Sequence, residues 1–326
     1  MNKKDLIQYI LKSDILKKWH WFSYHFKFYQ IGLESLFAKS IVESCLECDK
    51  FIPGFSKDMI DNLSYLSGKE KYEPHYEQLF QRLAEILIIN QVVNYKWING
   101  VEFLWEPTTD LNNKNPELVV ALKDMRIGIE VKSPSLLKHI RQRSLSKFQL
   151  TERNMGIKKW AVQSYKGDNL VFPRDNVIKD FLLSANEKFE GFKKNDKDFY
   201  GVLVIVWDDY IYEPITSLLG EFSGLFTVNS FFKNEKGEII KFLNVDGVII
   251  IRHIHQFMEA AAERSMFDNC KHALDYGRDG DFPPKAYIQN PYGNKLPSEV
   301  LKCLQADIPN ITWGAEYMPQ NGVFWI

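Results

Sequence analysis

Two stretches of consecutive apolar residues constrain the fold of this 326-residue chain more than any other feature of its sequence. They are FYGVLVIVW at residues 199–207 and GVIII at residues 247–251. A strand with one face in water alternates apolar and polar residues, whereas a strand covered on both faces is apolar throughout. We therefore expect both stretches to be buried strands of a mixed central sheet flanked by helices, which places the chain in the α/β class.

A β-hairpin is expected upstream of the first buried strand. Residues 118–122 (LVVAL) have the composition of a strand, residues 123–126 (KDMR) are polar enough to turn the chain, and a second strand opens at Ile127. Pro134 follows closely and ends the second strand, because proline cannot continue the hydrogen-bonded ladder.

The expected pairing of this hairpin gathers three ionisable side chains. If Leu122 pairs with Ile127, Glu117 lies opposite Lys132, and Glu130 shares their face because side chains alternate along a strand. A shift of the register by one pair would change the partners but keep the shared face, whereas a shift by an odd number of residues would separate them.

These three side chains suit a site for a hard divalent cation. Mg²⁺ prefers oxygen ligands and is commonly held by one or two carboxylates together with water. Glu117 and Glu130 can supply the carboxylates, and the carbonyl of Val131 is a further candidate ligand. Lys132 would position the attacking water or offset negative charge on a phosphoryl group. A simple ion pair between Glu130 and Lys132 is the alternative.

The same residues resemble the catalytic signature of the PD-(D/E)XK nuclease superfamily, which includes restriction endonucleases, recombination nucleases and Holliday-junction resolvases. The resemblance lies in Pro116-Glu117, followed across the hairpin by Glu130-Val131-Lys132. It implies a restriction-endonuclease-like core, in which a helix precedes a three-stranded meander that carries the motif, and a second helix and a further strand follow. It also implies Mg²⁺ as the cofactor, for which Mn²⁺ can substitute.

The resemblance covers roughly residues 74–207, and the sequence contains helices in the two required places. Residues 75–93 and residues 175–192 both have apolar residues at helical spacing. In the superfamily a glutamate on the first helix often joins the site, so Glu85 is the candidate and Glu77 the alternative. A solvated surface acid is the competing interpretation of Glu85.

Glu117 departs from the superfamily pattern, which usually has aspartate at the first acidic position. Asp110 and Asp124 are the other candidates for that ligand. Asp124 lies in the expected turn, at the wrong end of the hairpin, and Asp110 would require the first strand to start elsewhere.

Basic residues are concentrated in an insert at residues 136–160, between the motif and the second helix. The whole chain has 41 Lys and Arg against 42 Asp and Glu, so net charge alone does not indicate a nucleic-acid-binding protein. A local cluster can still steer a polyanion, although many charge runs are only solvated surfaces. The candidate contacts to nucleic acid are Arg141, Arg143 and Lys147 in the insert and Lys179 and Lys188 on the second helix.

The remaining segments define the expected organisation. We expect an N-terminal helical region at residues 1–70, a nuclease core at residues 71–260 and a C-terminal extension at residues 261–326. No apolar run approaches the ~20 residues of a membrane-spanning helix, and the N-terminus lacks a signal-peptide cleavage region. These features predict a cytoplasmic protein without a membrane partner.

The sequence thus predicts a Mg²⁺-dependent nuclease, with DNA as the expected substrate and endonucleolytic cleavage as the expected reaction. Extra regions of this kind are common in nucleases of restriction or antiviral (anti-phage) defence, which is the expected context. The alternative is a nuclease-fold module with a relaxed site, which binds nucleic acid or assembles with a partner ATPase or helicase. The chain has neither a phosphate-cradling glycine loop nor a nucleophile elbow, which argues against NTPases and serine hydrolases.

Overall fold

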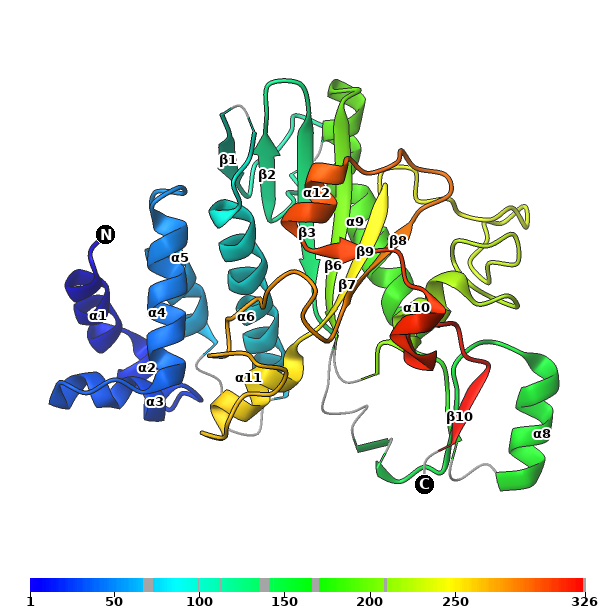
Figure 1. The fold of residues 1–326 in the computed structure, drawn as a ribbon, viewed down its shortest axis with the longest axis horizontal. Coiled ribbons are helices and arrows are strands. Elements are labelled where there is room, and N and C mark those ends of the chain that lie inside the picture. The colour runs from blue at the N-terminus through cyan, green and yellow to red at the C-terminus, as the bar shows by residue number, and fades with distance from the viewer. Residues whose placement is uncertain are drawn as a thin grey trace.

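A mixed seven-stranded sheet lies at the centre of the protein, with helices on both of its faces (Figure 1). This arrangement, seen in a computed structural model, confirms the α/β class and the mixed central sheet flanked by helices. The structure describes residues 1–66, 73–98, 100–111, 113–134, 141–142, 144–165, 170–207 and 210–324. No helix among these residues is long and apolar enough to cross a membrane.

The strand order in the sheet is β1-β2-β3-β6-β7-β8-β9. The first three strands form an antiparallel meander, β6 and β7 continue parallel to β3, β8 is antiparallel to β7, and β9 is parallel to β8. The strands are β1 (Glu102–Trp105), β2 (Leu118–Ala121), β3 (Arg126–Lys132), β6 (Phe199–Trp207), β7 (Gly247–Arg252), β8 (Lys285–Gln289) and β9 (Ala306–Asp307).

The two apolar stretches of the sequence form β6 and β7, which lie side by side in the middle of the sheet. Nearly every residue of both strands is buried. Their side chains alternate between two hydrophobic cores, one on each face, as Val204 and Leu203 illustrate. The prediction of strands covered on both faces is therefore confirmed.

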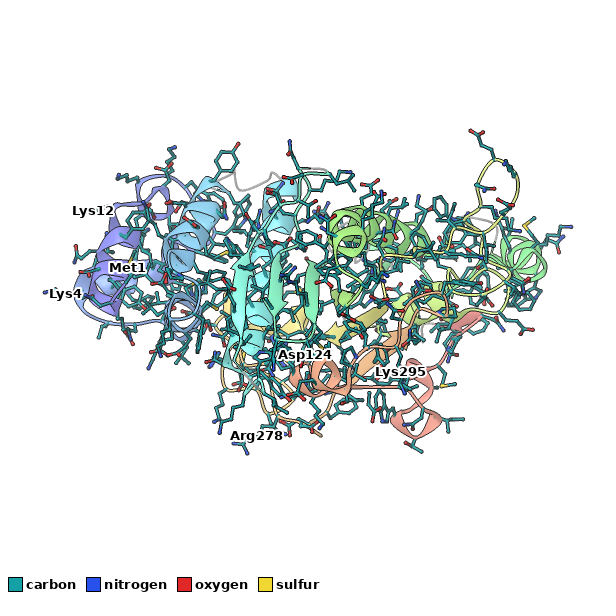
Figure 2. All side chains as sticks on the ribbon, turned by 90° about the horizontal axis from the view of Figure 1, so that it is seen from above. Met1, Lys4, Lys12, Asp124, Arg278 and Lys295 are labelled. Carbon is teal, nitrogen blue, oxygen red and sulfur yellow. The ribbon has the colours of Figure 1, made fainter. Side chains whose placement is uncertain are left out.

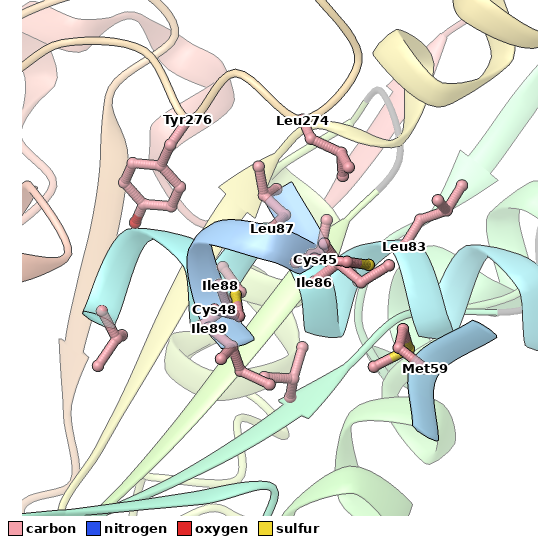
Figure 3. Close-up of a cluster of buried hydrophobic side chains, with 14 of the residues drawn as sticks. Cys45, Cys48, Met59, Leu83, Ile86, Leu87, Ile88, Ile89, Leu274 and Tyr276 are labelled. Carbon is pink, nitrogen blue, oxygen red and sulfur yellow. The ribbon is translucent and has the colours of Figure 1, made fainter. Parts of the chain in front are cut away.

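One face of the sheet is covered by α6 and by a bundle of N-terminal helices. Apolar side chains of α4, α5 and α6 pack into one core with Leu274 and Tyr276 (Figure 3). The residues at which the N-terminal region was expected to end, 67–72, lie outside the described part of the chain. The helices of this layer are α1 (Lys3–Lys12), α2 (Asp14–Lys17), α3 (Ser23–Lys27), α4 (Leu36–Asp49), α5 (Phe55–Tyr65), α6 (Glu73–Asn94) and α11 (Ile254–Ala261).

The opposite face is covered by α9 (Asp175–Asn195) and α10 (Tyr212–Leu219). Two glycines allow α9 to approach the sheet closely. A Cβ atom on Gly128 of β3 would lie 2.3 Å from the Phe199 ring and 2.9 Å from the Phe189 ring of α9, and one on Gly201 of β6 would lie 2.6 Å from Phe189. Phe189 thus fills space that side chains would otherwise occupy, and it sets the position of its neighbour Lys188.

A smaller structure lies beside the central sheet and is called the peripheral lobe here. It contains a three-stranded sheet in the order β10-β4-β5 and the helix α8, and Figure 1 shows it at the lower right. Phe148, Leu150 and Ala161 form its own small core. The elements of the lobe are β4 (Phe148–Leu150), α8 (Met155–Tyr165), β5 (Leu170–Val171) and β10 (Gly322–Phe324), and α12 (Ser298–Cys303) precedes β9 in the central sheet.

Candidate active site

The hairpin between β2 and β3 turns more tightly than the sequence suggested. The Leu122 N–H donates to the Met125 carbonyl at 2.9 Å, so the two residues between them form the turn. The register that pairs Leu122 with Ile127 is wrong, because Ile127 pairs with Val120. The predicted register is off by one residue pair, because the observed turn leaves two residues between the paired strands where the prediction left four.

The observed register still gathers the predicted residues. Leu118 pairs with Ile129, which brings Glu117, the residue before β2, level with Glu130 instead of Lys132. A shift by one full pair preserves the alternation of side chains. Glu117, Glu130 and Lys132 therefore share the face of the sheet that α9 covers.

Glu130 is the centre of this cluster. Its side chain is fully buried. Its Oε1 atom accepts a hydrogen bond from the Lys188 ammonium at 2.7 Å and forms an ion pair with Lys132, also at 2.7 Å. Its Oε2 atom is buried and has no hydrogen-bond partner among the residues that the structure describes. A buried carboxylate with two cations on one oxygen and an open second oxygen retains the capacity to accept a further donor or cation.

Glu117 lies beside Glu130, and Lys188 contacts both carboxylates. The Lys188 Nζ atom is 3.6 Å from Glu117 Oε1. Burial, together with the carboxylates of Glu85 and Glu130, raises the pKa of Glu117 to about 8. Burial alone would lower the pKa of Lys188. The nearby carboxylates of Glu130 and Glu117 outweigh the effect of burial and raise this pKa, so the lysine is charged. The cluster on this face thus combines two buried acids with two lysines.

Glu85 reaches the same region from α6, on the other side of the sheet. It is 2% exposed, which excludes the interpretation of a solvated surface acid. Arg82 donates to its Oε2 atom at 2.6 Å and Gln81 to its Oε1 atom at 2.9 Å. Burial raises the pKa of Glu85, although Arg82 and Gln81 partly oppose the effect.

Gln81 connects α6 to the end of β3. Its side-chain amide donates to the Val131 carbonyl at 2.9 Å, and its oxygen accepts from the Ser133 N–H at 2.8 Å. These bonds satisfy backbone groups where β3 ends, and they hold Glu85 near the carboxylates of the sheet. Gln81 and Arg82 were not among the predicted site residues, although their spacing of four and three residues before Glu85 is the helical signal for such contacts.

The two alternative first ligands lie at the opposite end of the hairpin. Asp124 is in the turn, which faces the viewer in the view from above (Figure 2). Asp110 lines a cavity together with Arg126 and Phe199, the first residues of β3 and β6. Glu130 and Lys132 are at the other end of β3, so Glu117 is the only one of the three acids placed beside them.

The residues predicted to contact nucleic acid differ in their exposure and in their ion-pair partners. Arg141 and Lys147 are exposed, whereas Arg143 lies outside the described residues. Lys179 pairs with Asp180 at 3.0 Å and lies over an aromatic ring. Lys188, also a predicted phosphate contact, pairs with Glu130.

The donor set suits a hard divalent cation held by two carboxylates. Glu130 offers an unpartnered oxygen, and Glu117 lies on the same face. The Val131 carbonyl already accepts from Gln81, and Glu85 is paired with Arg82. Within the described part of the chain, no group of three or more His, Cys, Asp or Glu side chains is arranged to hold a metal ion. The site therefore offers two carboxylate ligands, both in contact with Lys188.

Comparisons with protein-family models, with curated proteins and with solved structures give no match for this chain. The geometry of the cluster is accordingly the basis for its functional interpretation.

Proposed function

We propose that this protein is a metal-dependent nuclease with a PD-(D/E)XK-like core, and that it hydrolyses phosphodiester bonds in DNA. The observation that carries the proposal is the buried carboxylate of Glu130, which shares one sheet face with Glu117 and Lys132 at the end of β3. Two acids and a lysine on paired strands are the residue types that phosphodiester hydrolysis with a hard cation requires.

The order of elements supports the same proposal. α6 precedes the meander β1-β2-β3, α9 follows it, and β6 then pairs parallel to β3. This is the order that the resemblance implies for a restriction-endonuclease-like core. The motif lies on the second and third strands of the meander, and both core helices contribute a side chain to the cluster, Glu85 from α6 and Lys188 from α9.

Each side chain has a distinct role in this proposal. Glu117 and Glu130 hold the cation, Mg²⁺ or Mn²⁺, which when bound activates water and offsets charge on the phosphoryl group. Lys132 orients the attacking water and stabilises the developing negative charge. Glu85, paired with Arg82, adds negative charge on the α6 side of the ligands.

The proposed setting is cytoplasmic restriction or antiviral defence, in which a nuclease of this kind cuts invading DNA. The exposed Arg141 and Lys147 lie in the segment that follows β3 and would contact the phosphate backbone. A partner ATPase or helicase would deliver the substrate in such a system.

One observation favours the second candidate, a nuclease-fold module with a relaxed site. The Lys188 ammonium contacts both carboxylates that would hold the cation. If that contact persists in solution at millimolar Mg²⁺, the protein binds nucleic acid without cutting it and depends on a partner for activity.

Incubation of the purified protein with supercoiled plasmid in Mg²⁺ or Mn²⁺ separates the two candidates. The proposed nuclease nicks or linearises the plasmid, and the activity disappears in EDTA and in the Glu130→Gln variant. Binding without cleavage in both metals supports the relaxed module instead.

A further inference from the structure

The peripheral lobe carries an exposed aromatic surface that the proposed active site does not use. Trp160 of α8 is 47% exposed and Phe324 of β10 is 56% exposed, and their ring centroids are 6.2 Å apart. Single exposed aromatic residues are common on protein surfaces, but two neighbouring rings on elements far apart in the sequence form a defined surface.

The lobe holds these rings in fixed orientations. Trp160 packs edge-on against Phe148 with a centroid distance of 5.6 Å, and Phe324 lies 4.7 Å from the same ring. Tyr165 stacks on Phe148 from α8, at an interplanar angle of 6°. The buried Phe148 thus supports the outer rings from below, so the surface is preorganised without a ligand.

The helix that carries Trp160 is basic. Lys158 and Lys159 precede Trp160 directly, both are exposed, and α8 has no acidic residue. The one acid between residues 144 and 165 is Glu152, which is buried and accepts from the Phe222 N–H at 3.2 Å. Lys158 also lies over the ring of Phe172, another half-exposed aromatic residue. Positive charge beside exposed rings complements a strand that presents phosphates and unstacked bases together.

The position of the lobe connects it to the proposed site. β4 follows β3 in the chain, and Arg174, just after β5, lies with its guanidinium 4.4 Å from the ring centroid of Trp207 at the end of β6. Lys132 is at the same end of the sheet, because Lys132 of β3 pairs with Ile205 of β6. A strand held on the lobe would therefore approach the sheet at the end where Glu130 and Lys132 lie.

We propose that Trp160 and Phe324, flanked by Lys158 and Lys159, form a stacking surface for single-stranded nucleic acid. The inference rests on the proposed function and deepens it, because it identifies an unpaired strand as the part of the substrate that the protein binds. The rings stack on bases, which are buried within a duplex, and the lysines contact the phosphates of the same strand.

Binding measured in EDTA tests this surface independently of cleavage. Fluorescence anisotropy with a labelled 20-nucleotide oligothymidine and with a blunt duplex of the same length should show tighter binding of the single strand. Trp160→Ala should weaken single-strand binding by at least about 5-fold, as expected for the loss of one stacking contact. Trp160→Phe should retain most of the affinity, and thermal unfolding should verify that both variants are folded.

The lysines are tested by salt dependence. Replacement of Lys158 and Lys159 by Ala should reduce the slope of log K against log salt by about 1.4, the value for two phosphate contacts on a single strand. The matched control replaces Lys4 and Lys12, two exposed lysines of α1 at the end of the molecule opposite the lobe (Figure 2), and should leave both affinity and slope unchanged.

Unchanged affinity in Trp160→Ala together with an unchanged slope in the double lysine variant would overturn the proposal. A wild-type preference for the blunt duplex, or binding to anionic vesicles in place of oligonucleotides, would also overturn it. A protein that binds single strands through the lobe but cuts nothing in Mg²⁺ would retain this inference and contradict the nuclease proposal.

Discussion

Lys188 of α9 donates to the buried carboxylate of Glu130 on β3 at 2.7 Å, on the same oxygen atom that Lys132 contacts. The helix can place its ammonium there because Gly128 and Gly201 leave room for Phe189 against the sheet. Lys188 thus supplies a positive charge between two acids that would otherwise repel one another. A divalent cation at this position would compete with that lysine.

Lys188→Met should therefore strengthen the binding of Mn²⁺. The variant removes a charge-assisted hydrogen bond of roughly 1.5–3 kcal/mol that the cation must replace, so we expect about a tenfold or greater gain in affinity by isothermal titration calorimetry. Lys179→Met is the matched control, because Lys179 lies on the same helix and pairs with Asp180. Weaker Mn²⁺ binding in Lys188→Met would show that the lysine organises the site and does not compete for it.

The role of Glu117 is tested by its two closest replacements. Glu117→Asp should retain measurable cleavage, since it keeps the carboxylate and shortens its reach by one methylene. Glu117→Gln should abolish cleavage, because a neutral amide is a poorer ligand for a hard dication. Asp110→Asn and Asp124→Asn should cleave plasmid at close to the wild-type rate. Loss of activity in Asp110→Asn but not in Glu117→Gln would move the first ligand away from β2.

Gly128→Ala should destabilise the protein. The new methyl group would lie 2.3 Å from Phe199 and 2.9 Å from Phe189, and overpacking of a close-packed core typically costs about 1–3 kcal/mol. Urea unfolding monitored by circular dichroism measures the loss. Gly156→Ala, at the exposed start of α8, is the control and should change the free energy of unfolding much less. Equal stability of Gly128→Ala and the wild type would mean that α9 is not held to the sheet through this contact.

The protonation of His253 should lower the stability of the protein as the pH falls from 7 to 5. Burial lowers the pKa of His253 to about 4, and its Nε2 atom lies 2.7 Å from the Ala273 carbonyl. Between that value and the ordinary histidine pKa of about 6.5, the unfolded chain binds more protons than the folded one. The free energy of unfolding should fall by on the order of 2 kcal/mol between pH 7 and pH 5 from this group.

The variant His253→Gln isolates that contribution, because glutamine keeps an N–H donor but does not titrate. In urea unfolding at several pH values, the free energy of unfolding of the wild type should fall relative to that of the variant between pH 7 and pH 5. The variant keeps a pH dependence of its own, because other buried groups also titrate. Burial lowers the pKa of His20, His25 and His272, which destabilises the protein as the pH falls. The raised pKa values of Glu85 and Glu117 act in the opposite direction. An identical pH dependence in the two proteins would show that His253 is not the source.

The buried strands and the shared face of the motif could be predicted from the sequence for simple physical reasons. β6 and β7 are apolar along their length, and only burial on both faces explains such a composition. A register shift by a whole residue pair keeps Glu117, Glu130 and Lys132 on one face of the sheet. The prediction of a shared face therefore holds, although the register was wrong by one pair at the Leu122–Met125 turn.

The partners of these residues could not be predicted in the same way. The pairing of Lys188 with Glu130 could not be predicted, because nothing in the local sequence shows that Gly128 and Gly201 admit α9 so close to the sheet. Glu85 could be read equally as a surface acid, since its burial depends on how α6 packs across the end of β3. Such contacts depend on the packing of distant elements and follow only from the structure.

Cleavage of supercoiled plasmid by Glu130→Gln and Lys132→Ala, in Mg²⁺ and in Mn²⁺, tests the nuclease proposal most directly. Glutamine keeps the shape of the buried Glu130 and an oxygen that accepts from Lys188, so the variant should fold. The exposed Glu187→Gln on α9 is the control for the loss of an acid. We predict at least a ~10²-fold lower rate for each site variant and an unchanged rate for the control. Wild-type rates in both site variants would contradict the assignment of this cluster as the active site.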